Sequence, residues 1–260
     1  MIFERVLLTG AGGKVGSCLR AGLRDGLREL RLSDLQSIAP ETPNETDFPA
    51  DVSDFDAVSR AVEGVEAVIH LGAVPVEARF EELAGPNLHG VYHVFEAARR
   101  AGVRRVVYAS SNHATGFYPT TQRLTGAEPV RPDGLYGAAK AYGEALGHMY
   151  ADRFGLEVIS VRIGSMTGGE PTEPRHLSTW LSPGDAVRLF AACLTAPDVG
   201  YAVVYGASAN TRGWWDLSSA HALGYEPRDN AEDYAAKVGE GDAGEPQGGP
   251  FAARDSGGWA

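Results

Sequence analysis

The chain has 260 residues, of which 43 % are apolar and 22 % charged, and this ordinary globular usage excludes a wholly disordered protein. Acidic residues number 34 against 23 lysines and arginines, for a formal net charge of −11. Nucleic acids and anionic membranes attract a positive surface, so we expect neither as a partner. Two cysteines, Cys18 and Cys193, provide no disulfide framework. Together with the lack of a long apolar run, they predict a cytoplasmic protein.

Apolar runs of strand length alternate with segments of helical period along most of the chain. Strands are expected at 3–9, at 30–33, in a short run ending near Asp51, and at 66–71, 104–109, 156–162 and 202–205. Helices are expected at 14–25, 54–63, 80–101, 136–154 and 183–195. Strands that are apolar on both faces and alternate with helices are typical of a covered parallel sheet. We therefore predict an α/β fold, a Rossmann-type doubly wound parallel sheet with a small C-terminal substrate-binding region.

The domain boundary is expected near the C-terminus. Residues 1–238 are predicted to form a single catalytic domain, whose substrate-binding part lies mainly in 163–236. Residues 239–260 are rich in glycine, contain two prolines and lack apolar periodicity. Such a composition predicts a disordered or loosely attached tail.

Three glycines spaced three residues apart follow the first predicted strand. Gly10 permits a tight turn, Gly13 lets a pyrophosphate approach the backbone, and Gly16 lets the next helix pack closely on the strand. The alternative is a glycine turn that binds no ligand. The predicted cofactor-binding residues of this loop are Gly10, Gly12, Gly13, Lys14, Val15 and Gly16.

A carboxylate at the end of the second strand supports a dinucleotide site. Asp34 lies 18 residues after Gly16, where a carboxylate accepts hydrogen bonds from both ribose hydroxyls of the adenosine half. Its charge repels a 2′-phosphate, so we predict NAD and not NADP as the cofactor. The alternative role of Asp34 is to cap the next element. Asp51 and Val52 are expected to contact the adenine, although a plain turn at the strand end is equally compatible with them.

A tyrosine and a lysine occur four residues apart on a predicted helix. Tyr136 and Lys140 therefore share one face, and Ser111 ends the preceding strand of the sheet. A phenol is a weak base at its usual pKa near 10, but a neighbouring ammonium and a bound nicotinamide cation favour the phenolate. Tyr136 is thus predicted to take a proton from an alcohol while Ser111 holds its oxygen, as oxidation by hydride transfer requires.

Several motifs are similar to those of one enzyme family. TGAGGKVG (9–16), Asp34, HLGA (70–73), YASSN (108–112) and YGAAK (136–140) resemble the extended short-chain dehydrogenase/reductases, also called NAD-dependent epimerase/dehydratases. The resemblance spans about residues 3–165 and implies a Rossmann fold, NAD and catalysis by the serine, tyrosine and lysine. It also implies further cofactor contacts from Leu71, Gly72, Ala73, Lys140 and Ile163.

Other segments are similar to a narrower group, the uronate dehydrogenases. These are ASSNHATGFYPTT (109–121), RPDGLYG (131–137), RIGS (162–165), LSTWLS (177–182) and VVYGASANTRGWWD (203–216). The resemblance implies oxidation of the anomeric carbon of D-galacturonate or D-glucuronate to an aldarolactone, within hexuronate catabolism. Chain length agrees, because the residues after Tyr136 leave little room to enclose a nucleotide-sugar.

A sugar acid brings a carboxylate to an acidic protein, which therefore needs a dedicated cation. Arg175, ten residues after Ser165 in the loop beyond the sixth strand, is predicted to bind this carboxylate, although a surface arginine is the alternative. By the resemblance, Asn112 and His113 bind ring hydroxyls, and Ser165 lies at the ligand-binding edge of the sheet. The remaining predicted substrate contact is Pro75, where the family often has a small polar residue, so a side-chain hydrogen bond from that position is not expected.

Two other functions use part of the same signature. A nucleotide-sugar 4-epimerase or dehydratase has the same three catalytic residues but retains its NAD, and a non-catalytic dinucleotide sensor needs only the glycine loop.

No metal is expected, because the histidines and cysteines lack ligand spacing. The helices at 80–101 and 136–154 are candidates for an interface, so we expect a homo-oligomer, from dimer to hexamer.

Overall fold

The computed structural model describes residues 3–239, 241 and 245–252. It contains a seven-stranded, all-parallel sheet in the order β3-β2-β1-β4-β5-β6-β7. The chain builds outward from β1 to β3 and then returns to place β4 beside β1. Ligands bind at the carboxyl ends of the strands where the order reverses in this way. The strands are β1 (Arg5–Thr9), β2 (Glu29–Ser33), β3 (Glu45–Asp47), β4 (Ala67–His70), β5 (Arg105–Ser111), β6 (Glu157–Ile163) and β7 (Tyr201–Gly206).

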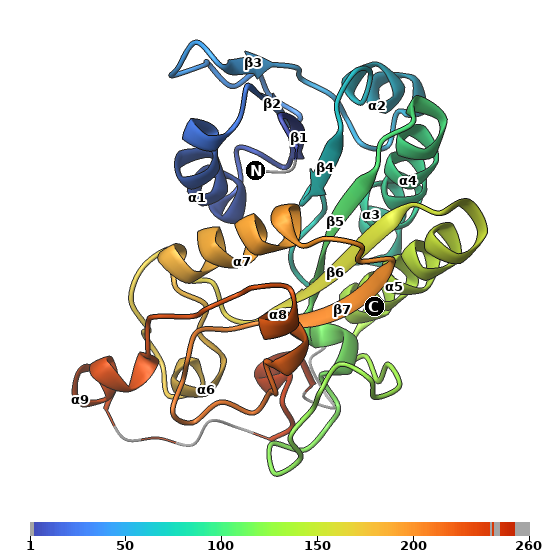
Figure 1. The fold of residues 1–260 in the computed structure, drawn as a ribbon. Coiled ribbons are helices and arrows are strands. Elements are labelled where there is room, and N and C mark those ends of the chain that lie inside the picture. Colours follow the sequence, from blue (N-terminus) through green and yellow to red (C-terminus); the bar gives the residue numbers. More distant parts are fainter. Residues whose placement is uncertain (1–2, 240, 242–244, 253–260) are drawn as a thin grey trace.

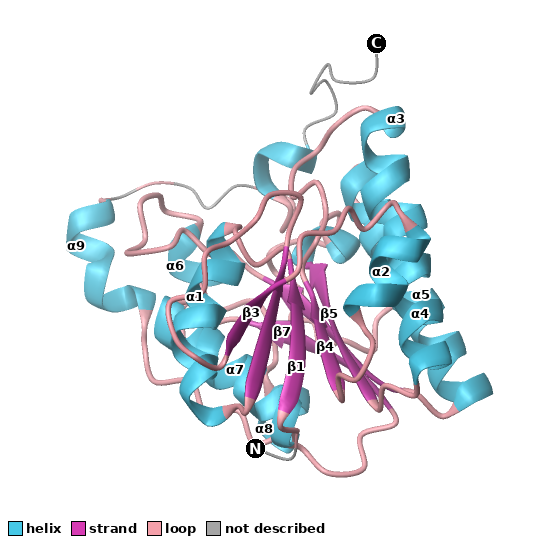
Figure 2. Cartoon of the chain, turned by 90° about the horizontal axis from the view of Figure 1, so that it is seen from above, coloured by secondary structure: helices cyan, strands magenta, loops and turns pink. Residues whose placement is uncertain are grey.

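Helices cover both faces of this sheet, as Figure 2 shows. Helices α1, α7 and α8 pack on one face, and α2, α4 and α5 pack on the other (Figure 1). Among the described residues, no helix combines the length and apolar character needed to cross a bilayer. The helices are α1 (Lys14–Leu23), α2 (Phe55–Ala61), α3 (Phe80–Leu83), α4 (Gly90–Ala101), α5 (Leu135–Phe154), α6 (His176–Thr179), α7 (Pro183–Thr195), α8 (Ser218–Ala222) and α9 (Ala235–Val238).

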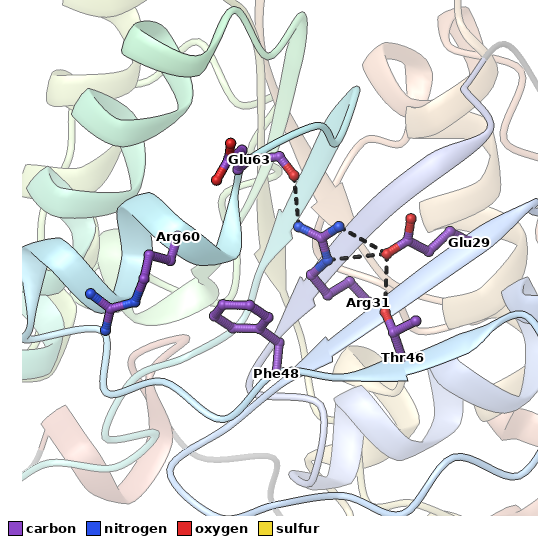
Figure 3. A pocket seen from close by; sticks show the side chains of 6 residues that line it. All are labelled: Glu29, Arg31, Thr46, Phe48, Arg60 and Glu63. Atoms are coloured by element: carbon purple, nitrogen blue, oxygen red, sulfur yellow. Dashed lines mark hydrogen bonds and ion pairs between the residues drawn. The ribbon is translucent and has the colours of Figure 1, made fainter.

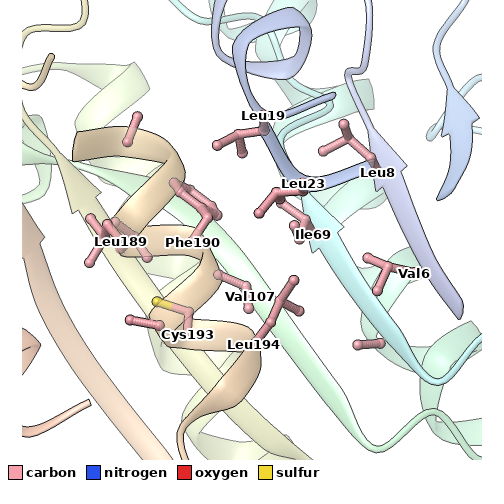
Figure 4. Close-up of a cluster of buried hydrophobic side chains, with 14 of the residues drawn as sticks. Val6, Leu8, Leu19, Leu23, Ile69, Val107, Leu189, Phe190, Cys193 and Leu194 are labelled. Atoms are coloured by element: carbon pink, nitrogen blue, oxygen red, sulfur yellow. The ribbon is translucent and has the colours of Figure 1, made fainter. Parts of the chain in front are cut away.

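The alternation of side chains along each strand produces two apolar layers. In β1, Val6 and Leu8 point to the layer formed with α1 and α7, whereas Leu7 points to the layer formed with α2 and α4. Both sets are buried, which explains the nearly continuous apolar runs in the sequence. Figure 4 shows the first layer, with Val6, Leu8, Leu19, Leu23, Ile69, Val107, Leu189, Phe190, Cys193 and Leu194 labelled.

The predicted doubly wound parallel sheet is confirmed, with one strand displaced. The third strand, β3, ends at Asp47 and not near Asp51. Pro49 lacks the N–H that would continue the ladder, although Ala50 N still donates to Asp34 O (2.9 Å). The other strands are found within two residues of their expected bounds.

The helix predicted at 80–101 is divided into three parts. Between α3 and α4, residues Ala84–His89 form a π-helical turn that contains Pro86. Proline cannot donate to the helical ladder, and the wider turn accommodates it. The turn directs the buried Asn87 side chain onto the loop after β4, where it accepts a hydrogen bond from Val74 N (2.9 Å) and donates one to Val74 O (3.0 Å). Through Asn87, the π-helical turn therefore holds the loop that contains Pro75.

The C-terminal tail differs in part from its prediction. Residues 245–252 are packed against the domain, and Gln247 is only 1 % exposed. Gln247 N donates to Tyr118 O (2.9 Å), and Gly248 N donates to Gly116 O (2.8 Å). The expectation of loose attachment is therefore wrong for this segment, because backbone hydrogen bonds replace the missing apolar periodicity. Residues 240, 242–244 and 253–260 lie outside the described part of the chain.

Candidate active site

The glycine loop between β1 and α1 has a shape that only glycine permits. Gly10 has φ +68°, and a Cβ on it would lie 2.8 Å from Gly72 N. A Cβ on Gly16 would lie 2.1 Å from Gly10 O. Leu71 N, at the end of β4, donates to Thr9 O (3.2 Å). The structure thus brings the loop together with Leu71 and Gly72, next to the half-buried Ala73, at the carboxyl edge of the sheet.

Helix α1 begins at an exposed glycine loop. Its N-cap is Gly13, without a side-chain hydrogen bond, and its first turn has no acidic residue. By contrast, Asp54 caps α2 and Ser182 caps α7. Free N–H groups at the positive end of a helix attract anions. Gly12, Gly13 and Lys14 are exposed and Val15 half-buried, so the region fits the pyrophosphate of a dinucleotide.

Asp34 lies directly beside this loop. Its Oδ2 accepts a hydrogen bond from Gly12 N (2.9 Å) and its Oδ1 from Leu35 N (2.8 Å). The next element is the strand β3, so Asp34 does not cap a helix. Each carboxylate oxygen has a further lone pair, which fits the predicted contact with ribose hydroxyls.

The remaining predicted cofactor residues lie farther along the same edge. Asp51 is exposed in the loop between β3 and α2, and its Oδ1 accepts from Ser53 N (2.8 Å), as in a turn. Val52 is buried, and a Cβ on Gly72 would lie 3.0 Å from it. Ile163 ends β6 and pairs with Ser111 of β5. The adenine contact of Asp51 and Val52 remains a prediction.

The structure brings the serine, the tyrosine and the lysine together. Tyr136 lies in the first turn of α5, and Lys140 lies one turn later with its Nζ 5.6 Å from the Tyr136 ring centroid. Lys140 is only 4 % exposed and donates to Ala109 O (2.8 Å). Ser111, also buried, ends β5 and accepts from His113 N (3.2 Å). A substrate hydroxyl placed here would meet the phenol and the serine away from bulk water.

Burial is the main cause of the pKa shifts of Tyr136 and Lys140. It raises the pKa of Tyr136 to about 12, and the charge of Asp133 acts in the same direction, whereas the hydrogen bond with Ser111 lowers it. Burial lowers the pKa of Lys140 to about 8. Desolvation of the phenolate is therefore the dominant influence, and the predicted lowering of the phenol pKa by the ammonium together with the nicotinamide cation stays a prediction.

A half-buried arginine lies in the loop before α6, close to two of the predicted substrate residues. Arg175 Nη1 donates to Ser165 Oγ (3.0 Å), and Nη2 donates to Gln247 O (2.6 Å). With its amide oxygen turned toward the arginine, Asn112 accepts from Nη2 (3.0 Å) and donates to Ile163 O (3.1 Å). Three predicted substrate residues thus meet at one point, beside Ser111.

The charge of Arg175 has no anionic partner in the described part of the chain. No carboxylate oxygen there lies within 4 Å of its guanidinium, and its Nε is buried without an acceptor. Burial lowers the pKa of Arg175, which reflects the free-energy cost of holding a cation away from water. An arginine is still charged at neutral pH, so the site favours an anionic ligand.

His113 is oriented by a carboxylate that the sequence gives no reason to select. Its Nδ1 lies 2.7 Å from Oδ2 of the buried Asp133. The imidazole meets the Tyr136 ring edge-on, with the two centroids 5.9 Å apart. A carboxylate on one ring nitrogen fixes the tautomer, so the other nitrogen keeps a defined role toward a ligand.

Comparisons with known proteins agree with this geometry. The profile of the NAD dependent epimerase/dehydratase family matches residues 6–202.

The chain belongs to this family.

Relatives with about 48 % identity are uronate dehydrogenases. The chain is 48 % identical to the uronate dehydrogenase of Pseudomonas syringae pv. tomato over 91 % of its own length and 86 % of the relative's. The crystal structure of uronate dehydrogenase from Agrobacterium tumefaciens has a TM-score of 0.91 and 45 % identity, covering 97 % of both chains. A mutant of that enzyme complexed with NAD has a TM-score of 0.91 and 44 % identity, covering 96 % of this chain and 97 % of its own. NAD is thus the cofactor of this protein.

One residue that sequence reasoning missed anchors the start of α5. Glu77 Oε1 accepts from Leu135 N (2.9 Å), and its Oε2 accepts from Tyr136 N (3.0 Å). A carboxylate stabilises the positive end of a helix, so Glu77 fixes the start of α5. It also ties the loop that contains the exposed Pro75 to Tyr136. No local pattern links positions 58 residues apart, which is why only the structure identifies this contact.

A surface pocket elsewhere contributes nothing to this site. It has a volume of about 320 Å³ and is lined by residues of β2, of the strand beside it and of the region around α2 (Figure 3). Arg31 in this pocket is bound to Glu29, Ala61 O and Glu63 O. In the described ranges, no three His, Cys, Asp or Glu side chains form a group suited to a metal ion.

An Asp34→Asn variant is expected to relax the discrimination between cofactors. Asparagine keeps an oxygen acceptor beside the loop but removes the charge that repels a 2′-phosphate. The ratio of kcat/KM with NADP to that with NAD should rise by about tenfold or more, since like charges in contact cost several kcal/mol. Steady-state kinetics with both cofactors measure this ratio, and an unchanged ratio would remove Asp34 from cofactor selection.

A Ser111→Ala variant is expected to shift the pH profile of oxidation. The hydrogen bond with Ser111 lowers the pKa of Tyr136, so its loss raises that pKa. Because the phenol must lose its proton to act as a base, the acid limb of log(kcat/KM) should move to higher pH. Measuring the profile at saturating NAD tests this expectation. A limb that stays in place or moves to lower pH would contradict it.

Proposed function

We propose that the protein oxidises the anomeric carbon of D-galacturonate or D-glucuronate with NAD and releases the aldarolactone. The observation that carries this proposal is the half-buried Arg175 cation, which lacks a carboxylate partner in the described chain and lies beside Asn112 and Ser165. A free sugar acid supplies the missing charge. The names of the relatives support the same substrate class.

The carboxylate of the sugar acid binds Arg175, which Ser165 and Asn112 hold in place. Arginine is suited to this task because its guanidinium is charged at neutral pH, and Nη1 has a second hydrogen to donate beside its bond to Ser165. Ser165 and Asn112 are neutral and leave its charge available. His113, oriented by Asp133, contributes a further hydrogen bond to the ring hydroxyls.

The anomeric hydroxyl gives its proton to Tyr136 while Ser111 holds its oxygen. Bound NAD supplies the hydride acceptor and a positive ring that favours the phenolate. This help is required because burial otherwise raises the pKa of Tyr136 to about 12. Lys140 adds positive charge one helical turn away and binds the nicotinamide ribose.

The other cofactor contacts follow the carboxyl edge of the sheet. The backbone of Gly12, Gly13, Lys14 and Val15 binds the pyrophosphate at the start of α1. Asp34 binds the ribose hydroxyls, and residues 51–52 lie toward the adenine. The segment 71–73 and Ile163 line the nicotinamide side.

Net formation of reduced cofactor distinguishes this function from its alternatives. The purified protein is incubated with NAD or NADP and a panel of uronates, aldoses and nucleotide-sugars, and the absorbance of reduced nicotinamide is followed. We expect stoichiometric NADH from free uronates. A nucleotide-sugar epimerase would accumulate none with its own substrate, and a dinucleotide sensor would bind NAD without turnover of any sugar.

We also propose a cytoplasmic homo-oligomer, between a dimer and a hexamer. Tyr92 of α4 and the α5 residues Tyr142 and Met149 are exposed apolar side chains on the outer helical face, which supports an interface there. Cys18 and Cys193 are free thiols, as suits a reducing compartment. Light scattering coupled to size-exclusion chromatography measures the oligomeric state.

A further inference from the structure

The buried side chain of Gln247 joins two separate loops. Its Oε1 accepts from Trp215 Nε1 (2.8 Å), and its Nε2 donates to Pro119 O (3.0 Å) and Gln122 O (2.8 Å). These hydrogen bonds engage both donors of the amide and one lone pair of its oxygen. Such a fully bonded, buried side chain holds the segment 245–252 firmly on the domain.

The backbone of the same residue reaches the predicted carboxylate-binding cation. Gln247 O accepts from Arg175 Nη2 (2.6 Å). Gly249 lies over the same side chain, and a Cβ added to it would come within 2.9 Å of Arg175 Nε. Its φ of +62° also favours glycine. The C-terminal segment therefore forms one wall of the site that holds Arg175.

All three groups that orient Arg175 are neutral. They are the Gln247 carbonyl, the Ser165 hydroxyl and the Asn112 amide oxygen, and no described carboxylate lies within 4 Å. A neutral acceptor fixes the direction of a guanidinium without neutralising it, whereas a carboxylate would compete with an anionic ligand. Preorganised groups bind tightly because less freedom is lost on binding.

We propose that Gln247 is a positioning residue for substrate recognition. It anchors the C-terminal segment, and its carbonyl holds Arg175 in the orientation that receives the substrate carboxylate. This inference rests on the proposed oxidation of a uronate. It assigns to the C-terminal segment a role in specificity, although the residue never contacts the reacting carbon.

The test compares Gln247→Ala with the wild type under the same conditions. The variant removes the side-chain anchor, so the Gln247 carbonyl is no longer held against Arg175. KM for the uronate is expected to rise by about tenfold, as when a hydrogen bond to a charged group is weakened, with kcat within about threefold. KM for NAD should be unchanged, because the cofactor residues lie on other segments. A control is Glu226→Ala, which removes an exposed side chain outside this hydrogen-bond network and should leave both constants unchanged.

Several outcomes would overturn the proposal. A folded Gln247→Ala protein with the uronate KM of the wild type would do so, as would a variant that loses only kcat or thermal stability. If the alanine variant does not fold, Gln247→Met, which keeps the length of the side chain without its hydrogen bonds, is measured in its place against the same expectations. Failure of the wild type itself to oxidise any uronate would instead reject the proposed function.

Discussion

A Tyr136→Phe variant is expected to lose about a thousandfold in kcat while it keeps its affinity for NAD. Proton transfer by a positioned side chain contributes roughly 100- to 10,000-fold to a rate, and phenylalanine removes only the hydroxyl that takes the proton. The ring of Tyr136 is buried, and phenylalanine retains this ring, so the substitution leaves the packing in place. Stopped-flow or steady-state kinetics give kcat, and titration of the protein with NADH gives the cofactor affinity.

The matched control for this substitution lies on the same helix. Tyr142→Phe removes the hydroxyl of an exposed tyrosine of α5 and should leave kcat unchanged. If Tyr136→Phe retained kcat within tenfold of the wild type, another group would have to serve as the base.

An Arg175→Ala variant is expected to lower kcat/KM for the uronate by about a thousandfold. Truncating one partner of a buried charge pair costs roughly 2–5 kcal/mol, and the complex proposed here contains such a pair. The loss should appear mainly in KM. Arg175→Lys should recover only part of it, since an ammonium keeps the charge but not the planar fork. Kinetics with uronate and with NAD as the varied substrates separate the two effects.

A surface ion pair provides the control for this variant. Arg212 is exposed and pairs with Glu232 (2.7 Å), and exposed pairs contribute little to stability or binding. Arg212→Ala should therefore keep the wild-type constants. Equal losses in KM for NAD and for uronate in Arg175→Ala would indicate general damage to the fold and contradict a specific carboxylate contact.

The parts of the site that the sequence predicted are those encoded locally. The glycine spacing requires only the end of a strand and the start of a helix, and Tyr136 and Lys140 need only one helical turn. The prediction that Arg175 binds a carboxylate depended on the net charge of the chain and on the resemblance to uronate dehydrogenases. The structure brings these residues together because parallel strands carry their segments to one edge of the sheet, and their roles stay predictions.

The contacts that the sequence did not predict join distant segments. Glu77 meets α5 from 58 residues away, and Gln247 meets Arg175 from 72 residues away. Neither position carries a periodic or motif signal. The glycine-rich composition of the tail gives no sign that Gln247 is buried. The burial of Gln247 depends on hydrogen bonds to loop carbonyls and not on an apolar pattern.

The pKa of Tyr136 shows a second limit of inference from spacing. Four residues on a helix place an ammonium near the phenol, but the pattern does not report how deeply both are buried. Desolvation raises the pKa of the tyrosine to about 12 and lowers that of the lysine to about 8. At neutral pH the phenol is consequently protonated, and its proposed role as a base requires the cofactor's cation to favour the phenolate.

Deuterium at carbon 1 of D-glucuronate offers the most direct test of this account. The labelled sugar is incubated with the protein and NAD, and the reduced cofactor is isolated and analysed by mass spectrometry. We predict one deuterium in each reduced nicotinamide, together with net formation of the lactone. Unlabelled reduced cofactor, or none at all, would contradict oxidation at the anomeric carbon.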